Sequence, residues 1–121
     1  MTERSAVKSI ELRSRTKAFA LRVLRLVNSL PRRMDSDVIA KQLLRSATSV
    51  AANYRAAQRS RSKAEFISKI SVVVEEADET VFWLELLTES GLVSAERIGD
   101  LTREANELLA IFAASQRTAR N

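Results

Sequence analysis

The side chains available for chemistry in this chain are arginines, lysines and carboxylates, because its 121 residues contain neither His nor Cys. A Ser-His-Asp triad, a cysteine nucleophile and imidazole or thiolate metal ligands are therefore excluded. The nearest approach to a metal motif is Glu76-x-x-Glu79, but bundles that bind two metals add Glu-x-x-His pairs on facing helices. The 2 Gly, Gly91 and Gly99, are isolated, which leaves no glycine-rich phosphate loop. We therefore expect no catalytic site, no cofactor and no metal, in a protein that is not an enzyme.

A cluster of basic residues lies in the middle of the chain. It consists of Arg55, Arg59, Arg61 and Lys63, interspersed with Ser and Ala. Clustered cations of this kind bind nucleic-acid phosphates without reading the base sequence. Base-specific recognition of a single strand depends on several aromatic residues, and only Tyr54 is close by. The alternative is that the four cations are ordinary solubilising residues around a loop.

The charge of the chain is divided unevenly between its halves. Residues 1–61 hold 14 Lys and Arg against 4 Asp and Glu, a net charge of +10. Residues 62–121 hold 6 against 11, a net charge of −5. One interpretation is that basic and acidic helices neutralise each other through weak surface ion pairs within one molecule. The other is that the two kinds of surface meet between copies of the chain.

Four segments with helical spacing of their apolar residues must position these groups. The chain has only 2 Gly and 1 Pro, too few for a sheet protein with many turns. Apolar residues instead recur at every third or fourth position almost throughout. The expected helices cover about residues 9–30, 36–59, 63–90 and 95–116. Short connections between them predict an all-α fold, a single-domain up-down-up-down antiparallel four-helix bundle over residues 1–121.

Capping residues mark the expected helix boundaries. Ser62-Lys63-Ala64-Glu65 is a capping box, in which Ser62 accepts from the Glu65 N–H while Glu65 reaches back. Gly91 is expected to end the same helix in the left-handed conformation. The C-terminal residues 117–121 are expected to fray. The other boundary signals are Pro31 after the first helix, Asp35 or Ser36 before the second, and Ser94 before the fourth.

The third expected helix carries a second apolar stripe. Val72, Trp83 and Leu86, with Phe82 at the edge, point away from the core stripe by about 100–160° at 100° per residue. Leu21 likewise lies outside the main stripe of the first helix. A second apolar face is an exposed patch unless something covers it. These five residues therefore predict an interface of a homo-oligomer, in which an acidic aromatic face meets a basic apolar face and the contacts close into a ring. The alternative is that they cover the ends of a monomeric core.

The antiparallel topology predicts a basic pole. The connection that holds Arg55, Arg59, Arg61 and Lys63 must share one end of the bundle with both chain termini. Copies in a ring would repeat this pole and strengthen its field. Further cations expected at the same end are Arg4, Lys8, Arg117 and Arg120.

Several stretches of the second and third helices resemble a known family. They are Lys41–Val50, Ala52–Arg55, Arg61–Phe66 and Glu76–Leu87, within a similarity that spans roughly residues 12–115. In order and spacing they resemble the four-helix-bundle proteins encoded in intervening sequences of bacterial large-subunit ribosomal RNA genes. The resemblance implies a small up-down bundle that assembles as a homopentamer.

A related branch of that family comprises the accessory variability proteins of diversity-generating retroelements, which contact nucleic acid and a reverse transcriptase. The resemblance therefore implies RNA or DNA, and a partner protein such as a reverse transcriptase, as candidate partners. It supplies no catalytic residue. No stretch of the chain approaches the ~20 apolar residues of a membrane span, and residues 1–15 lack the apolar core of a signal peptide. We expect a cytoplasmic protein that does not associate with membranes.

The favoured hypothesis is a non-enzymatic, ring-forming helical bundle that binds nucleic acid, RNA rather than DNA. Binding would use the cluster of four cations and would show no strong sequence specificity. The alternative is a protein–protein scaffold or adaptor, whose basic half serves self-assembly or docks to an acidic partner.

Overall fold

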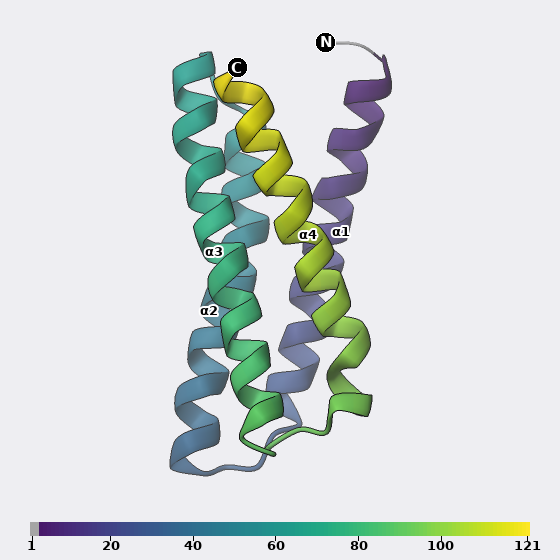
Figure 1. Cartoon of the computed structure of the whole chain (residues 1–121), viewed down its shortest axis with the longest axis vertical. Helices are drawn as coiled ribbons and strands as arrows, with labels where there is room; N and C mark the ends of the chain where they lie inside the picture. Colours follow the sequence, from purple (N-terminus) through teal and green to yellow (C-terminus); the bar gives the residue numbers. More distant parts are fainter. Residues whose placement is uncertain (1–2) are drawn as a thin grey trace.

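The computed structural model describes the chain from Glu3 onward, and its side chains from Lys8 onward, as four long helices. Successive helices run antiparallel, so the start of the first helix, the end of the last and the connection between the second and third lie at one end of the molecule (Figure 1). We call this end the terminal pole, and the end that holds the other two connections the opposite pole. The expected antiparallel four-helix bundle is confirmed. The helices are α1 (Glu3–Asn28), α2 (Met34–Gln58), α3 (Lys63–Glu89) and α4 (Ala95–Arg120).

Local capping explains where α3 and α4 begin. The Ser62 hydroxyl accepts from the Glu65 N–H at 3.1 Å, and the Glu65 carboxylate reaches back to the Arg61 N–H at 3.3 Å. The Ser94 hydroxyl accepts from a backbone N–H three residues further on, at 3.3 Å. Gly91 follows α3 with a φ of +80°, the left-handed conformation that glycine adopts without a steric penalty. Each of these four features was predicted from the sequence.

The start of α2 and the end of α4 differ from the sequence-based expectation. Helix α2 begins at Met34, and the residue before it, Arg33, supplies no side-chain cap. The Asp35 carboxylate accepts from the adjacent Ser36 N–H at 2.8 Å and is held by the Arg33 guanidinium at 2.9 Å. Neither Asp35 nor Ser36 is therefore the residue that precedes the helix. At the other end of the chain, α4 continues to Arg120, so the expected fraying after residue 116 is not observed.

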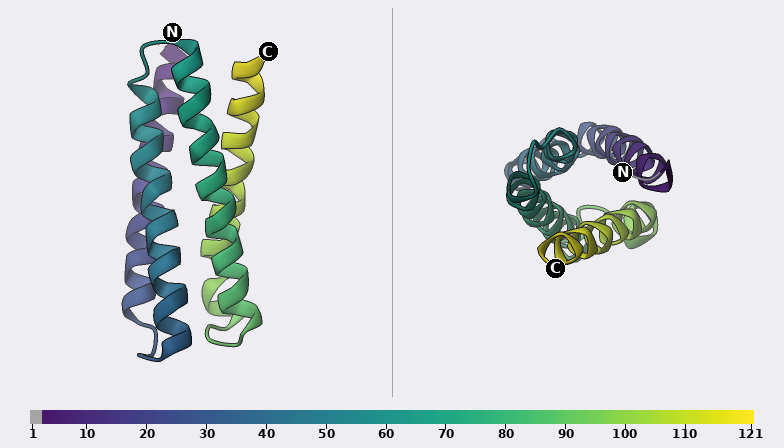
Figure 2. Two further views of the ribbon diagram at one scale, coloured as in Figure 1. Left: turned by 90° about the vertical axis from the view of Figure 1, so that its left-hand side faces the viewer. Right: turned by 90° about the horizontal axis from the view of Figure 1, so that it is seen from above.

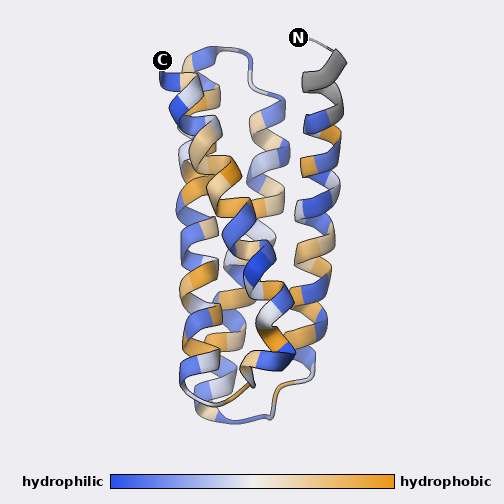
Figure 3. Cartoon of the chain, turned by 45° about the vertical axis from the view of Figure 1, so that its right-hand side comes forward, coloured by the Kyte–Doolittle hydropathy of each residue, from blue (hydrophilic) through white to orange (hydrophobic). Residues whose placement is uncertain are grey.

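One continuous apolar core runs through the bundle. Apolar residues recur along every helix (Figure 3), and their buried members come from all four. The ring of Tyr54 on α2 packs against Phe112 on α4, with ring centroids 5.0 Å apart. Full burial of one such side chain contributes about 1.5–3 kcal/mol. The largest fully buried side chains include Phe19, Leu43, Ile70, Leu84, Leu87, Ile98, Leu108 and Phe112.

A contact between two buried hydroxyls fixes the register of α2 relative to α3 along the bundle axis. The Thr80 hydroxyl lies 2.9 Å from the Ser46 hydroxyl, and both side chains are almost completely buried. Each hydroxyl also lies within hydrogen-bond distance of a carbonyl of its own helix, 2.7 Å for Thr80 and 3.2 Å for Ser46, so two hydroxyl protons serve three possible contacts. Buried polar groups must be satisfied in this way. The pair therefore opposes any sliding of α2 along α3.

The bundle is more open between α1 and α4 than between the other neighbouring helices. Seen along its axis, the molecule forms an arc that begins at α1 and ends at α4 (Figure 2). The Arg15 guanidinium bridges this seam and donates to Glu104 at 3.1 Å and to Glu107 at 3.0 Å. None of the four described helices has an apolar stretch long enough to cross a membrane.

Candidate nucleic-acid interface and assembly surfaces

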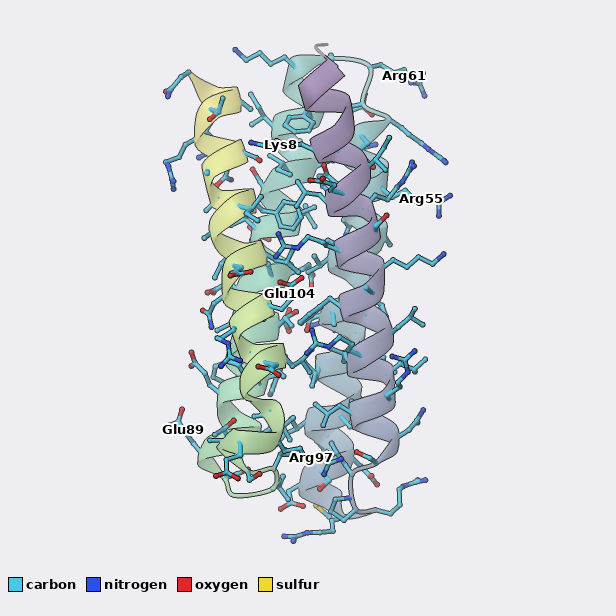
Figure 4. All side chains as sticks on the ribbon, turned by 90° about the vertical axis from the view of Figure 1, so that its right-hand side faces the viewer. Lys8, Arg55, Arg61, Glu89, Arg97 and Glu104 are labelled. Carbon is cyan, nitrogen blue, oxygen red and sulfur yellow. The ribbon has the colours of Figure 1, made fainter. Side chains whose placement is uncertain are left out.

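The structure places all four predicted nucleic-acid-binding residues at the terminal pole. Arg55 lies in the last turn of α2, Arg59 directly follows that helix, Arg61 lies in the connection and Lys63 begins α3. All four side chains are exposed. None of them forms an ion pair with a side chain in the described range, residues 8–121. Arg55 and Arg61 extend away from the bundle on the same side (Figure 4).

Helix α1 adds Arg13 to this basic surface, a residue that the sequence pattern did not single out. The Gln58 amide donates to the Ser9 carbonyl at 3.0 Å and so joins the start of α1 to the end of α2. Arg13 lies one turn beyond Ser9, close to Tyr54. Burial raises the pKa of the Tyr54 hydroxyl, and the nearby charge of Arg13 opposes that shift. Arg55 directly follows Tyr54 in the sequence. Arg13 therefore lies at about the same height along the bundle axis as Arg55.

The other cations expected at this pole point in several directions. Lys8 turns from α1 toward α4, into the seam between these helices and away from Arg55 (Figure 4). Arg117 and Arg120 are exposed in the last turn of α4. The side chain of Arg4 lies outside the described residues. The cations of the α1–α2 side thus include Arg13, Arg55 and Arg59.

The two carboxylates that resemble a metal motif bind an arginine instead. The Arg45 guanidinium on α2 donates to Glu76 at 3.2 Å and also contacts Glu79 directly. The Trp83 indole N–H donates to Glu79 at 3.3 Å. The hydrogen bond between Arg45 and Glu79 lowers the pKa of the Glu79 carboxyl. Within the described residues, no three His, Cys, Asp or Glu side chains are grouped so as to hold a metal ion.

An apolar surface lies beside this ion pair, toward the opposite pole. The Phe82 ring is 51% exposed and stands edge-on to the half-buried Trp83, with centroids 4.9 Å apart. Leu86 is half-buried on the same side of α3. Val72 is exposed as well, but it lies ten residues from Phe82, about 15 Å along the helix at 1.5 Å per residue.

Helix α2 contributes Val38 to the same surface. Arg45 meets Glu79 across the antiparallel seam, and Val38 precedes Arg45 by as many residues as Leu86 follows Glu79. Val38 and Leu86 therefore lie level on adjacent helices. Val38 is 55% exposed, and sequence reasoning missed it because it depends on the register between helices. We call Val38, Phe82, Trp83 and Leu86 the aromatic patch.

A second surface lies on α1. Leu21 and Leu24 are exposed and share one helix face with Lys17 and Arg25, which form no ion pair within residues 8–121. We call these four residues the basic apolar stripe. Leu21 precedes the end of α1 by as many residues as Phe82 precedes the end of α3. Because both helices run toward the opposite pole, the stripe and the aromatic patch lie at equal height along the bundle.

Comparison with known proteins identifies the family. Residues 8–114 match the sequence model described as 23S rRNA-intervening sequence protein. The chain belongs to this family. A crystal structure from Bacteroides thetaiotaomicron VPI-5482 has a similar fold, with 31% sequence identity and a TM-score of 0.83. The similarity covers 91% of this chain and 98% of that one, which is described as a protein with unknown function from the S23 ribosomal protein family. A comparison with curated proteins gives no match.

Membership of this family confirms the resemblance inferred from the second and third helices. The match covers α2 and α3 completely and most of α1 and α4, so the basic cluster and the aromatic patch both lie inside the family region. The description names the kind of gene in which members of the family are found. It names no ligand.

Proposed function

We propose that this chain is a non-enzymatic helical bundle that assembles into a ring and binds nucleic acid through its terminal pole. RNA is the expected ligand in preference to DNA, and binding shows no strong sequence specificity. The observation that carries the proposal is the set of exposed cations at that pole without carboxylate partners among residues 8–121. They are Arg13, Arg55, Arg59, Arg61 and Lys63.

Unpaired cations favour phosphate binding for a physical reason. A guanidinium already bonded to a carboxylate must give up that contact before it binds a phosphate, whereas Arg55 and Arg59 have no such contact with any side chain of residues 8–121. Each phosphate that is neutralised releases condensed counterions, and this release supplies affinity that does not depend on base sequence. Arginine also offers two parallel N–H groups to one phosphate. The pole is therefore suited to binding a nucleic-acid backbone.

The two apolar surfaces support assembly into a ring. Three of the four residues of the aromatic patch lie on the acidic helix α3, and the basic apolar stripe lies on α1, so contact between copies pairs opposite charges. A contact between two different surfaces closes into a ring when successive copies rotate without rising along the axis. The equal height of patch and stripe meets this condition. The family resemblance favours five subunits, and a ring would carry the terminal poles of all subunits on one rim.

A binding titration with matched variants tests the proposal. Fluorescence anisotropy of a mixed-sequence RNA, followed at low salt, measures affinity for the wild type and for Arg59→Ala/Arg61→Ala. We expect the double variant to bind about tenfold or more weakly, since two phosphate contacts are lost. The control is Arg32→Ala/Arg33→Ala, which removes the same charge at the opposite pole, where both arginines are paired with aspartates. Equal affinities for the two variants, or no binding by the wild type, would refute the proposal.

The second candidate function is that of a scaffold or adaptor, which the exposed aromatic patch favours because aromatic side chains are typical of protein interfaces. In that case the basic half of the chain serves self-assembly or docks to an acidic protein. The same Arg59→Ala/Arg61→Ala variant separates the two functions when its mass in solution is measured. A ring that stays intact while RNA binding is lost supports nucleic-acid binding. A broken ring shows that these arginines serve assembly.

A further inference from the structure

The outer face of α1 carries an apolar side chain with a cation on either side of it. Lys17 precedes Leu21 by four residues and Arg25 follows it by four, so all three share one face of the helix. All three side chains are exposed. Neither cation forms an ion pair with a side chain in residues 8–121. Both charges are therefore available to a partner.

The outer face of α3 has the complementary pattern. Asp78 precedes Phe82 by four residues and Glu85 follows it by three, which places these side chains on one face of the helix. All three are exposed, and neither carboxylate is paired with a cation among residues 8–121. The Phe82 ring thus lies between two negative charges, as Leu21 lies between two positive ones.

These two faces cannot neutralise each other within one molecule. Helix α1 packs against α2 and α4, and so does α3, so α1 and α3 lie diagonally across the bundle with the core between them. Their exposed faces therefore point to opposite sides of the molecule. Weak ion pairs between neighbouring helices of one copy do not account for these charges, and Lys17 can meet Asp78 only between copies.

The two patterns also lie at matching heights along the bundle. Phe19 of α1 lines one small internal cavity together with Ala77 and Thr80 of α3, so it lies level with this stretch of α3. Both helices run toward the opposite pole, so the same offset brings Lys17 level with Asp78 to within about one turn. It also brings the second cation of the α1 face level with the second carboxylate of the α3 face. Rotation about an axis parallel to the bundle preserves these heights from one copy to the next.

We propose that α1 of one copy packs parallel to α3 of the next copy, with Leu21 against the Phe82 ring. Lys17 then pairs with Asp78 on one side of this contact, and on the other side the second cation of α1 pairs with the second carboxylate of α3. The inference rests on the proposed ring and deepens it, because it assigns the direction and the register in which one copy docks on another. A second copy covers both faces at once, whereas a basic partner protein on α3 would leave the cations of α1 unpaired.

Engineered cysteines test the register, since the chain has no Cys of its own. A disulfide requires Cα atoms within about 7 Å of each other, so oxidation of Leu21→Cys/Phe82→Cys should link successive copies. The two positions face opposite sides of one molecule, so the link forms only between copies. Non-reducing electrophoresis should show a ladder of covalent oligomers. In the matched control, Leu21→Cys/Val72→Cys, the second cysteine lies about 15 Å away from position 82 along α3, and no ladder is expected.

The outcomes separate this contact from the ring itself. A double-cysteine variant that keeps the wild-type oligomer mass but forms no ladder would overturn the contact and leave the ring standing. A wild type that is a monomer in solution would overturn both. Cross-linking of Leu21→Cys alone would also overturn the contact, because it would place two copies of α1 face to face.

An exchange of charges tests the ion pairs by a second route. Light scattering of a dilution series, without RNA, measures the concentration at which half of the protein is assembled. Asp78→Lys should raise this concentration about tenfold or more, and Lys17→Glu/Asp78→Lys should restore it to within about threefold of the wild type. The control Arg25→Glu/Asp78→Lys has the same net charge but places like charges together at both pairs, since Arg25 is opposite Glu85, and should assemble no better than Asp78→Lys. Equal assembly of the two double variants would overturn the proposed pairing.

Discussion

The two poles of the bundle both carry arginines, and they differ in what those arginines contact. At the opposite pole the Arg33 guanidinium lies 2.9 Å from the Asp35 carboxylate, and Arg32 lies 3.4 Å from Asp37. At the terminal pole Arg55 and Arg59 have no carboxylate partner within residues 8–121. Counting charges along the sequence does not separate these two cases. Whether a cation is free to bind phosphate depends on the nearest carboxylate in space.

The largest expected effect comes from breaking the proposed ring, since this would reduce the terminal pole to a single copy. Phe82→Asp places a charge in the centre of the aromatic patch, where it would be buried between subunits at high cost. We expect the particle mass, measured by light scattering, to fall to that of a monomer. RNA affinity should fall about tenfold or more, because linked binding sites act together.

The control for this prediction is Ile10→Asp, which adds the same charge at an equally exposed apolar residue near the terminal pole, outside the patch and the stripe. It should leave the mass unchanged. A Phe82→Asp variant that keeps the wild-type mass, or a wild type that is already a monomer at micromolar concentration, would contradict the proposed assembly.

An intermediate effect is expected when the terminal pole is given a carboxylate like that of the opposite pole. Ala52→Glu places an acid three residues before Arg55 on the exposed face of α2, a spacing at which the two side chains can pair. RNA affinity should fall about threefold, through pairing of Arg55 and through repulsion of phosphate. Ala52→Gln, which has nearly the same shape without the charge, should bind RNA like the wild type. An unchanged affinity for Ala52→Glu would show that Arg55 does not contact RNA.

A smaller effect is expected from the converse change. Asp35→Asn/Asp37→Asn removes the carboxylates that hold Arg32 and Arg33, so the opposite pole comes to resemble the terminal one. RNA affinity, measured by anisotropy, should rise about twofold. The gain should disappear when Arg32→Ala/Arg33→Ala is added to the same chain. A gain that persists without those arginines would instead reflect the change in net charge alone.

The helices and their order could be predicted from the sequence because the signals are local. The Ser62–Glu65 capping box and the left-handed Gly91 depend on neighbours within a few residues, and both were read correctly. The start of α2 was predicted wrongly, since the helix begins at Met34 and not after Asp35 or Ser36. The Arg33 guanidinium holds the Asp35 carboxylate beside the Ser36 N–H, so Asp35 is part of the first turn.

The parts of the candidate surfaces that the sequence could not supply depend on how helices lie against one another. Arg13 joins Arg55 only because Gln58 bonds to Ser9 and sets the level of α1 against α2. Val38 joins the aromatic patch through the register of α2 and α3. Apolar periodicity specifies which face of a helix is buried, but not its register or separation from the next helix.

The smallest expected effect concerns Arg45, a paired cation in the middle of the bundle. The hydrogen bond from Arg45 lowers the pKa of Glu79, so the Glu79 carboxylate binds a proton less readily in the folded state than in the unfolded chain. The pair therefore adds stability above the unfolded pKa of Glu79, and this contribution is lost as the pH falls through the lowered folded value. Because both partners are largely open to solvent, this contribution is small.

Glu79→Gln should accordingly reduce the free energy of unfolding, measured in urea, at neutral pH and have progressively less effect in acid. The matched control is Glu75→Gln, at an exposed carboxylate on the same helix without an ion pair among residues 8–121. At neutral pH it should reduce the free energy of unfolding by less than Glu79→Gln does. The same pH profile for both variants would show that the Arg45 pair does not contribute to stability.

The most direct test of phosphate binding at the terminal pole is the salt dependence of RNA affinity. For single-stranded RNA, the logarithm of the association constant should fall with the logarithm of salt concentration with a slope of about −3.5 or steeper, as expected for five phosphate contacts. In Arg59→Ala/Arg61→Ala the slope should be shallower by about 1.4 or more, whereas Arg32→Ala/Arg33→Ala should keep the wild-type slope. A flat salt response, or an unchanged slope after the loss of Arg59 and Arg61, would contradict the account.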